Sequence, residues 1–169
     1  MIVLGVDPGT QATGYGVVEA DEPRLTLIEC GAIRPKGDLT LAERLLEILE
    51  GLTGVIDRAR PDVVCVEGVF YGRNVRTTVV LGHARGAVLL AAAARGIPVA
   101  EYPPAEVKKT VVGTGAADKT QVAFMVQKHL SLAEPPAPQD AADGVALALC
   151  HIFQLAPERR TGGVGRKQI

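Results

Sequence analysis

Two short, wholly apolar segments of the chain each run directly into an acidic residue. Ile2–Val6 is followed by Asp7, and Val63–Val66 is followed by Glu67. An apolar run without polar alternation is typical of a strand buried on both faces, as in the centre of a sheet covered by helices. Charged residues rarely end such strands without a partner. The pattern therefore predicts an α/β fold with a polar site at the strand ends.

The remaining sequence adds three strands and several helices to this pair. Residues 15–19 and 25–33 predict a meander with the first strand, and residues 99–102 predict a fifth strand. Apolar spacing and alanine-rich stretches predict helices over residues 39–59, 75–94, 105–111, 119–130 and 140–155. We expect one α/β domain over residues 1–156, with a five-stranded mixed sheet flanked by helices on both faces. Residues 157–169, rich in Gly, Arg and Lys, predict a basic, disordered tail.

The composition argues against several classes of protein. Cys30, Cys65 and Cys150 are odd in number and far apart, which favours a reducing compartment over disulfides or a zinc site. No apolar run approaches the ~20 residues that span a bilayer. The chain goes from Met1 directly into an apolar strand, without the basic start of a signal peptide. We therefore expect a cytoplasmic protein that does not contact a membrane.

Two further acidic residues stand at the predicted start of the last helix. Asp140 and Asp143 are three residues apart, so they lie on one face of that helix. Neighbouring strands that end at one edge, with a helix start laid against them, would bring these side chains to Asp7 and Glu67. Carboxylates so close repel one another and raise each other's pKa unless a cation binds between them.

An all-carboxylate cluster selects hard divalent ions, so the sequence predicts Mg²⁺, with Mn²⁺ as a substitute. Two such ions would balance four carboxylates, and an ion pair about 3.5–4 Å apart is typical of sites that hydrolyse phosphodiesters. Three of the four acids also have a purely structural interpretation, whereas Glu67 after a buried strand is harder to explain in this way. Asp7 begins a turn, Asp140 caps the last helix, and Asp143 interacts with the helix dipole.

An aromatic pair stands in the loop that follows the second acidic strand end. Phe70 and Tyr71 lie between Gly68 and Gly72, although the whole chain has only three Phe and three Tyr. Exposed rings can stack on unpaired bases, at about 1–3 kcal/mol per base. The alternative is that Phe70 packs beneath the loop as part of the core.

Basic residues are unevenly distributed, although the formal net charge is −1. Residues 72–119 include seven basic and three acidic residues, and the segment after Ala156 includes four basic and one acidic. Such segregation can present a basic surface to DNA phosphates, or it can reflect scattered solvated side chains. The candidate DNA-binding residues are Arg73, Arg76, Lys108, Lys109 and Lys119.

Two glycines stand one helical turn apart in the alanine-rich helix. Gly82 and Gly86 allow another element to approach that helix closely. One interpretation is packing against the sheet of the same domain. The other is the interface of a two-fold homodimer, which would place two identical sites on opposing DNA strands.

Four blocks of sequence carry a family resemblance. They are GVDPGT…TGYG from Gly5, VEGVF from Val66, VKKTVVG from Val107 and DAADGVALA from Asp140. In their order and spacing they resemble the RuvC family of Holliday-junction resolvases, which have the RNase H-like fold. The likeness covers about residues 1–155. Asp7-Pro8-Gly9 alone is weak, because it occurs in several related folds, whereas the four blocks together are specific.

The resemblance implies a metal-dependent endonuclease that resolves Holliday junctions by symmetric cuts in recombination and repair. Its products carry 5′-phosphate and 3′-hydroxyl ends. It implies catalytic metal ligands at Asp7, Glu67, Asp140 and Asp143. Some relatives carry His in place of one last-helix acid, whereas both positions are Asp here.

The resemblance also implies roles for residues outside the acidic cluster, and for partners. Lys108 and Lys119 match basic residues that assist catalysis or hold DNA, and Phe70 matches an aromatic that engages bases at the junction centre. A homodimer and the branch-migration proteins RuvA and RuvB are the implied protein partners.

Two other functions compete with this interpretation. Nucleotide-binding domains of the actin and sugar-kinase type also begin with a strand followed by Asp, but they need two such domains. Val112-Gly113-Thr114-Gly115 is not a Walker motif, because no Gly-Lys-Ser/Thr follows it. A junction-binding protein without nuclease activity is the second alternative, and the four acidic residues argue against it.

Overall fold

The computed structural model describes residues 1–68 and 75–161 of the chain, with side chains described as far as residue 155. The strands are β1 (Ile2–Asp7), β2 (Thr13–Asp21), β3 (Arg24–Ile33), β4 (Val63–Glu67) and β5 (Val99–Tyr102). The helices are α1 (Leu41–Ala59), α2 (Val75–Ala93), α3 (Pro104–Val112), α4 (Lys119–His129) and α5 (Gln139–Thr161). Three candidate DNA-binding residues lie outside the described part, namely Phe70, Tyr71 and Arg73.

The five strands form one mixed sheet in the order β3-β2-β1-β4-β5. β1 is antiparallel to β2 and parallel to β4, and β4 is parallel to β5. The predicted five-stranded mixed sheet is therefore confirmed. Val3 and Leu4 of β1 and Val66 of β4 are fully buried, as their unbroken apolar runs predict.

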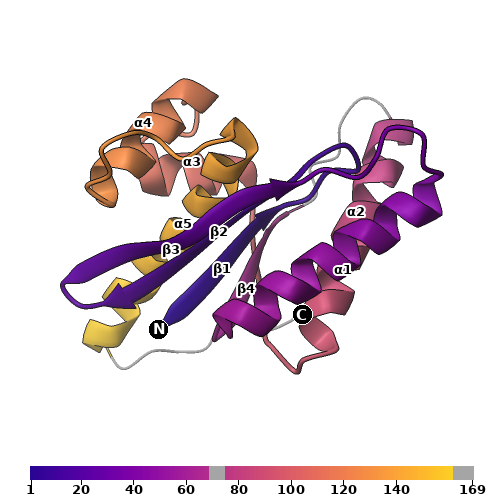
Figure 1. The fold of residues 1–169 in the computed structure, drawn as a ribbon. Helices are drawn as coiled ribbons and strands as arrows, with labels where there is room; N and C mark the ends of the chain where they lie inside the picture. Colours follow the sequence, from indigo (N-terminus) through magenta and orange to yellow (C-terminus); the bar gives the residue numbers. More distant parts are fainter. Residues whose placement is uncertain (69–74, 162–169) are drawn as a thin grey trace.

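Helices cover both faces of the sheet (Figure 1). One face packs against α5, with α3 and α4 beside it, and the other packs against α1 and α2. Alternate residues of each central strand point to opposite faces, so Val3 belongs to the α5 core and Leu4 to the α1–α2 core. None of the helices in the described ranges is long and apolar enough to cross a membrane.

Close packing of α5 on the sheet depends on glycines on both sides of the contact. A Cβ on Gly144 of α5 would lie 2.6 Å from the Cα of Tyr15, and one on Gly5 of β1 would lie 2.6 Å from the backbone nitrogen of Ala148. Real Cβ atoms do not approach other atoms so closely, so any larger residue would push the helix away. The glycines thus allow the first turns of α5 to pack closely against β1 and β2.

Helix boundaries follow capping more closely than hydrophobic spacing. α1 begins after Thr40, whose hydroxyl accepts from the N–H of Glu43 in a reciprocal capping box. Asp118 caps α4 in the same way and makes Lys119 its first residue. α5 continues to Thr161 rather than ending near Leu155, although the segment contains a proline, which has no backbone N–H to donate. Part of the predicted disordered tail is therefore helical, and residues 162–169 lie outside the described chain.

Candidate active site

The parallel pairing of β1 and β4 brings the first two acidic residues together. Val6 pairs with Val66, so the next residues, Asp7 and Glu67, end the two strands at the same edge of the sheet. Their side chains share a hydrogen bond. They line a cavity of about 210 Å³ together with Asp143 of α5. Three of the four predicted acidic residues therefore meet around one cavity.

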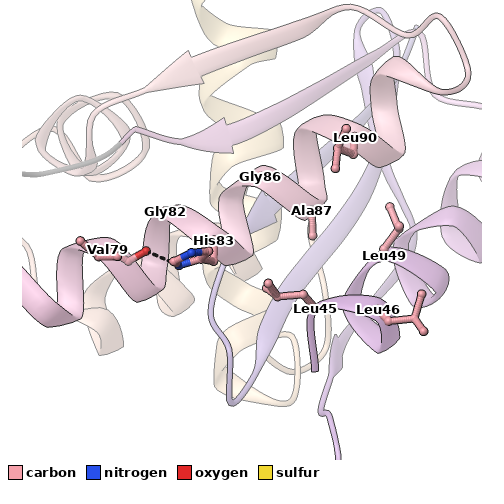
Figure 2. A pocket seen from close by; sticks show the side chains of 9 residues that line it. All are labelled: Leu45, Leu46, Leu49, Val79, Gly82, His83, Gly86, Ala87 and Leu90. Carbon is pink, nitrogen blue, oxygen red and sulfur yellow. Dashed lines mark hydrogen bonds between the residues drawn. The ribbon is translucent and has the colours of Figure 1, made fainter. Parts of the chain in front are cut away.

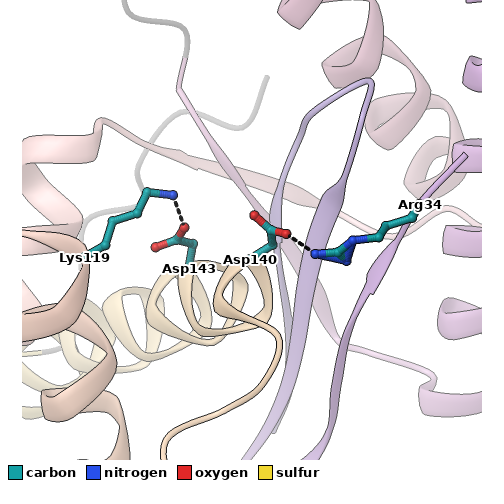
Figure 3. A network of polar contacts seen from close by, with 4 residues as sticks. All are labelled: Arg34, Lys119, Asp140 and Asp143. Carbon is teal, nitrogen blue, oxygen red and sulfur yellow. Dashed lines mark hydrogen bonds and ion pairs between the residues drawn. The ribbon is translucent and has the colours of Figure 1, made fainter. Parts of the chain in front are cut away.

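Two lysines border the same cavity. Lys108 lines it from α3 and Lys119 from the first turn of α4. The Lys119 Nζ donates to Asp143 Oδ2 over 2.6 Å, and this hydrogen bond raises the pKa of the lysine (Figure 3). The site thus pairs its carboxylates with cations that face the same space.

Asp140 lies at the edge of this cluster, in a different polar environment. Arg34, which directly follows β3, donates from Nη2 to Asp140 Oδ2 over 2.6 Å (Figure 3). Asp140 lines a second cavity, of about 490 Å³, between the β1–β2 loop and α2. Its charge still acts on Lys119, whose pKa it helps to raise. Asp140 is the second residue of α5 rather than its cap, because the helix begins at Gln139.

Burial and mutual repulsion change the acidity of the strand-end carboxylates. The pKa of Asp7 rises to about 7, first because the side chain is buried and next because Glu67 and Asp143 repel its charge. Burial and Asp143 also raise the pKa of Glu67. Near neutral pH the pair therefore retains a proton where a cation is absent.

The donor set fits a hard divalent ion, although the acids do not surround a common point. Within the part of the chain that the structure describes, no group of three or more His, Cys, Asp or Glu side chains is arranged to hold a metal ion. Asp143 and Asp140 each give an oxygen to a basic side chain, and Asp7 and Glu67 share a hydrogen bond. A divalent ion bound here would replace that proton and supply the positive charge that the buried oxygens require.

Four other described basic residues of the segment 72–119 lie in different surroundings. Arg76 lines the second cavity beside Asp140, and Lys109 is exposed on α3. Arg85 pairs with Glu101 of β5, and Arg95 pairs with Asp57 of α1. The charge pattern of residues 72–119 is thus only partly available to DNA, because these two arginines link elements of the fold.

Arg34 is the site residue that the sequence did not indicate. It is a lone arginine after a strand, and its partner lies 106 residues away in the chain. No spacing rule joins positions so far apart. Only the packing of α5 across β2 and β3 brings them together.

A mixed five-stranded sheet with carboxylates at the ends of its two central strands and at a helix start defines an RNase H-like nuclease. The family model of crossover junction endodeoxyribonuclease RuvC matches residues 3–151. The chain belongs to the RuvC family of crossover junction endodeoxyribonucleases, and membership in this nuclease family implies dependence on a divalent metal ion.

Individual relatives resemble the chain over almost its whole length. It is 48% identical to the crossover junction endodeoxyribonuclease RuvC of Pelotomaculum thermopropionicum, covering 95% of this chain and 98% of the relative. The RuvC of Chloroflexus aurantiacus is 46% identical, with 96% and 99% covered.

Solved structures agree with the fold. The Thermus thermophilus RuvC structure has a TM-score of 0.84 and 36% identity, and covers 100% of both chains. The T. thermophilus RuvC in complex with Holliday junction substrate has a TM-score of 0.85 and 34% identity, again over 100% of both chains. The yeast mitochondrial resolvase Ydc2 shares the fold, with a TM-score of 0.66 and 14% identity over 94% of this chain and 82% of Ydc2.

Proposed function

We propose that this chain resolves four-way DNA junctions by hydrolysing one phosphodiester bond in each of two opposing strands. The observation that carries the proposal is the cavity shared by Asp7, Glu67 and Asp143 with Lys108 and Lys119. Acids that bind cations, next to lysines that face the same space, suit a polyanionic substrate. The cuts leave 5′-phosphate and 3′-hydroxyl ends for a ligase, in homologous recombination and DNA repair.

The metal ligands of the proposal are Asp7, Glu67, Asp140 and Asp143. Oxygen donors of this kind favour Mg²⁺, with Mn²⁺ as a substitute, and four carboxylates balance two divalent ions. Bound there, the ions supply activation of the attacking water and stabilisation of the leaving oxygen. The raised pKa of Asp7 supports the assignment, because such a carboxylate gains most from a neighbouring cation.

Lys119 is the proposed catalytic lysine, and Lys108 assists it. Lys119 holds Asp143 through a 2.6 Å hydrogen bond and borders the cavity, so its ammonium would lie beside a phosphate bound in that cavity. Its raised pKa keeps it charged throughout the physiological range. The lysine thereby orients an acidic ligand and attracts the phosphodiester with one charge.

DNA binding beyond the cavity involves Arg76 and Lys109, together with three residues outside the described chain. Arg76 borders the cavity beside Asp140, and Lys109 is exposed on the same helix as Lys108. Stacking of Phe70 and Tyr71 on bases at the junction centre, with Arg73 on a nearby phosphate, stays a prediction from sequence.

The second copy needed for two cuts is proposed to bind at the α1–α2 face. A groove of about 610 Å³ lies there, and Leu45, Leu46 and Leu49 line one side of it (Figure 2). A Cβ on Gly82 or Gly86 would meet nothing within 4 Å, so neither glycine is needed for packing inside the chain. This favours the homodimer interpretation of the glycine pair over packing against the sheet.

The remaining assignments of the proposal rest on family resemblance. Residues 1–156 act as the nuclease domain and residues 157–169 as a basic extension. RuvA and RuvB are the proposed branch-migration partners. The cytoplasm is the proposed location, because the relatives are bacterial and the proposed substrate is DNA.

A nicking assay on a synthetic four-way junction tests the function. We expect cuts in Mg²⁺ and Mn²⁺, at symmetric positions on two opposing strands when the nicks are mapped by strand-specific labelling. A linear duplex of the same sequence is the control and should stay intact. Junction binding without cuts in either metal would identify a binding protein instead, and ATP turnover without cuts would support the nucleotide-binding alternative.

A further inference from the structure

Arg34 joins the far edge of the sheet to the first turn of α5. Its Nη2 lies 2.6 Å from Asp140 Oδ2, and the other oxygen of Asp140 points away from it (Figure 3). The two side chains are 51% and 34% exposed, so the pair is accessible to solvent and to ligands. An ion pair of this kind can exchange partners without unfolding its surroundings.

Together with Lys119, Arg34 neutralises the negative charge of the two acids at the start of α5. Lys119 neutralises Asp143, Arg34 neutralises Asp140, and Asp7 and Glu67 share a hydrogen bond. Each last-helix acid therefore already has a cation on one oxygen. A divalent ion that approaches the free protein meets less negative charge than four acids would otherwise present.

We propose that Arg34 is a positioning residue that holds Asp140 in the DNA-free protein and releases it when a DNA phosphate binds. Arg34 then weakens divalent-ion binding by the free protein and couples metal binding to substrate binding. The inference rests on the proposed role of Asp140 as a metal ligand. It concerns the timing of metal binding, which is separate from the hydrolysis itself.

The cavity beside Asp140 has room and a basic residue for the competing anion, a DNA phosphate. The cavity of about 490 Å³ that Asp140 lines is bordered by Thr10 and Gln11 of the β1–β2 loop and by Arg76 of α2. A DNA strand held there by Arg76 places phosphates beside Asp140. Phosphate binds a guanidinium in the same two-pronged geometry as a carboxylate, so it competes with Asp140 for Arg34.

Calorimetric titration with Ca²⁺ tests the inference on the full chain, alone and with a saturating four-way junction shown by gel to stay uncut. We expect Arg34→Gln alone to bind Ca²⁺ about two- to five-fold more tightly, the range expected for a partly exposed ion pair. The increase in affinity that the junction causes should shrink by the same factor. Arg34→Lys, which keeps the charge, should stay near the wild type.

A matched control is an ion pair between α1 and β3. Arg58 of α1 pairs with Glu29 of β3 over 3.2 Å at comparable exposure, on residues that line neither acidic cavity. Arg58→Gln should leave Ca²⁺ affinity unchanged. Unchanged or weaker Ca²⁺ binding by Arg34→Gln overturns the inference. Asp140→Asn tests the underlying ligand role separately, since unchanged metal binding and cleavage in that variant would refute the ligand assignment itself.

Discussion

The two faces of the sheet are covered in different ways. On one face, α5 lies so close to β1 and β2 that glycines are required at the contact, and Gly16 would place a Cβ 2.7 Å from the Cα of Val145. On the other face, α1 and α2 leave an apolar groove. Leu46, Val79 and Leu90 line that groove while 52%, 53% and 63% exposed (Figure 2).

The difference separates chemistry from assembly. Close packing on the α5 face holds Asp143 within reach of Asp7 and Glu67, and this requires only one chain. The groove face keeps apolar surface in water, where burial would yield about 25 cal/mol per Å². A fold that already buries its core on both faces leaves such a groove free for the proposed second copy. Four experiments test this separation.

Asp7→Asn should have the largest effect, confined to the α5 face. It removes a proposed metal ligand, so cleavage of a four-way junction should fall by about a thousand-fold or more, roughly 4 kcal/mol of activation free energy. Junction affinity should be unchanged or higher, because a negative charge facing the phosphate is lost. Gel assays of single-turnover cleavage and of binding measure both. Equal losses of binding and cleavage would contradict the charge argument.

Gly16→Ala should break the α5 contact. The added methyl overlaps the backbone of Val145, so we expect a loss of about 3 kcal/mol in the free energy of unfolding, as for other overpacked cores. Urea denaturation measures it. Gly82→Ala, measured at a concentration at which the chain is monomeric, is the matched control, since within one chain a Cβ there meets nothing within 4 Å and alanine favours helix. Similar destabilisation by both substitutions would remove the distinction between the faces.

Leu46→Glu should act on assembly alone. A charge in the apolar groove disfavours burial against a second copy, so the dimer dissociation constant should rise about 100-fold, or roughly 2.7 kcal/mol. Sedimentation velocity across protein concentrations measures this shift, and circular dichroism checks the monomer fold. Glu50→Gln, another exposed α1 position, is the control. A Leu46→Glu dimer of unchanged affinity would exclude this groove as the interface.

The pH dependence of stability tests the buried carboxylate of the α5 face without DNA or metal. The folded pKa of Asp7, about 7, lies above its ordinary 3.8, so the folded state binds a proton that the unfolded state releases. Metal-free stability should therefore fall by roughly 3 kcal/mol between about pH 4 and pH 7, since each unit of pKa difference corresponds to about 1.4 kcal/mol. Urea unfolding in EDTA at several pH values measures the slope. Asp7→Asn should flatten it, and an unchanged slope in that variant would assign the effect to other groups.

The predictability of the fold follows from local patterns. The central strands are apolar without interruption, and burial on both faces follows directly from that composition. The starts of α1 and α4 were predicted to within two residues, and the reciprocal caps at Thr40 and Asp118 set them locally. The extension of α5 to Thr161 was missed, because the proline and the Gly-, Arg- and Lys-rich composition after Ala156 predict that the helix ends there.

The site was predictable only in part. Parallel strands that end at one edge bring Asp7 beside Glu67 whatever the details of packing, and the structure places Asp143 at the same cavity. Asp140 lies instead against Arg34, although the helical spacing puts it on the same face as Asp143. The pairing of each acid with a basic residue depends on how side chains from different elements are oriented. These elements lie far apart in the sequence, so no spacing rule predicts the pairing.

The amino-acid sequence by itself determined which segments are buried and which acids stand at strand ends. Those features depend on the hydrophobicity of each segment and on neighbours a few residues away, so they can be predicted from short stretches of sequence. Only the tertiary structure decided that α5 rests on backbone glycines, that Arg34 holds Asp140, and that α2 turns its glycines outward. These arrangements depend on distances between elements far apart in the chain, which packing of the complete fold alone determines.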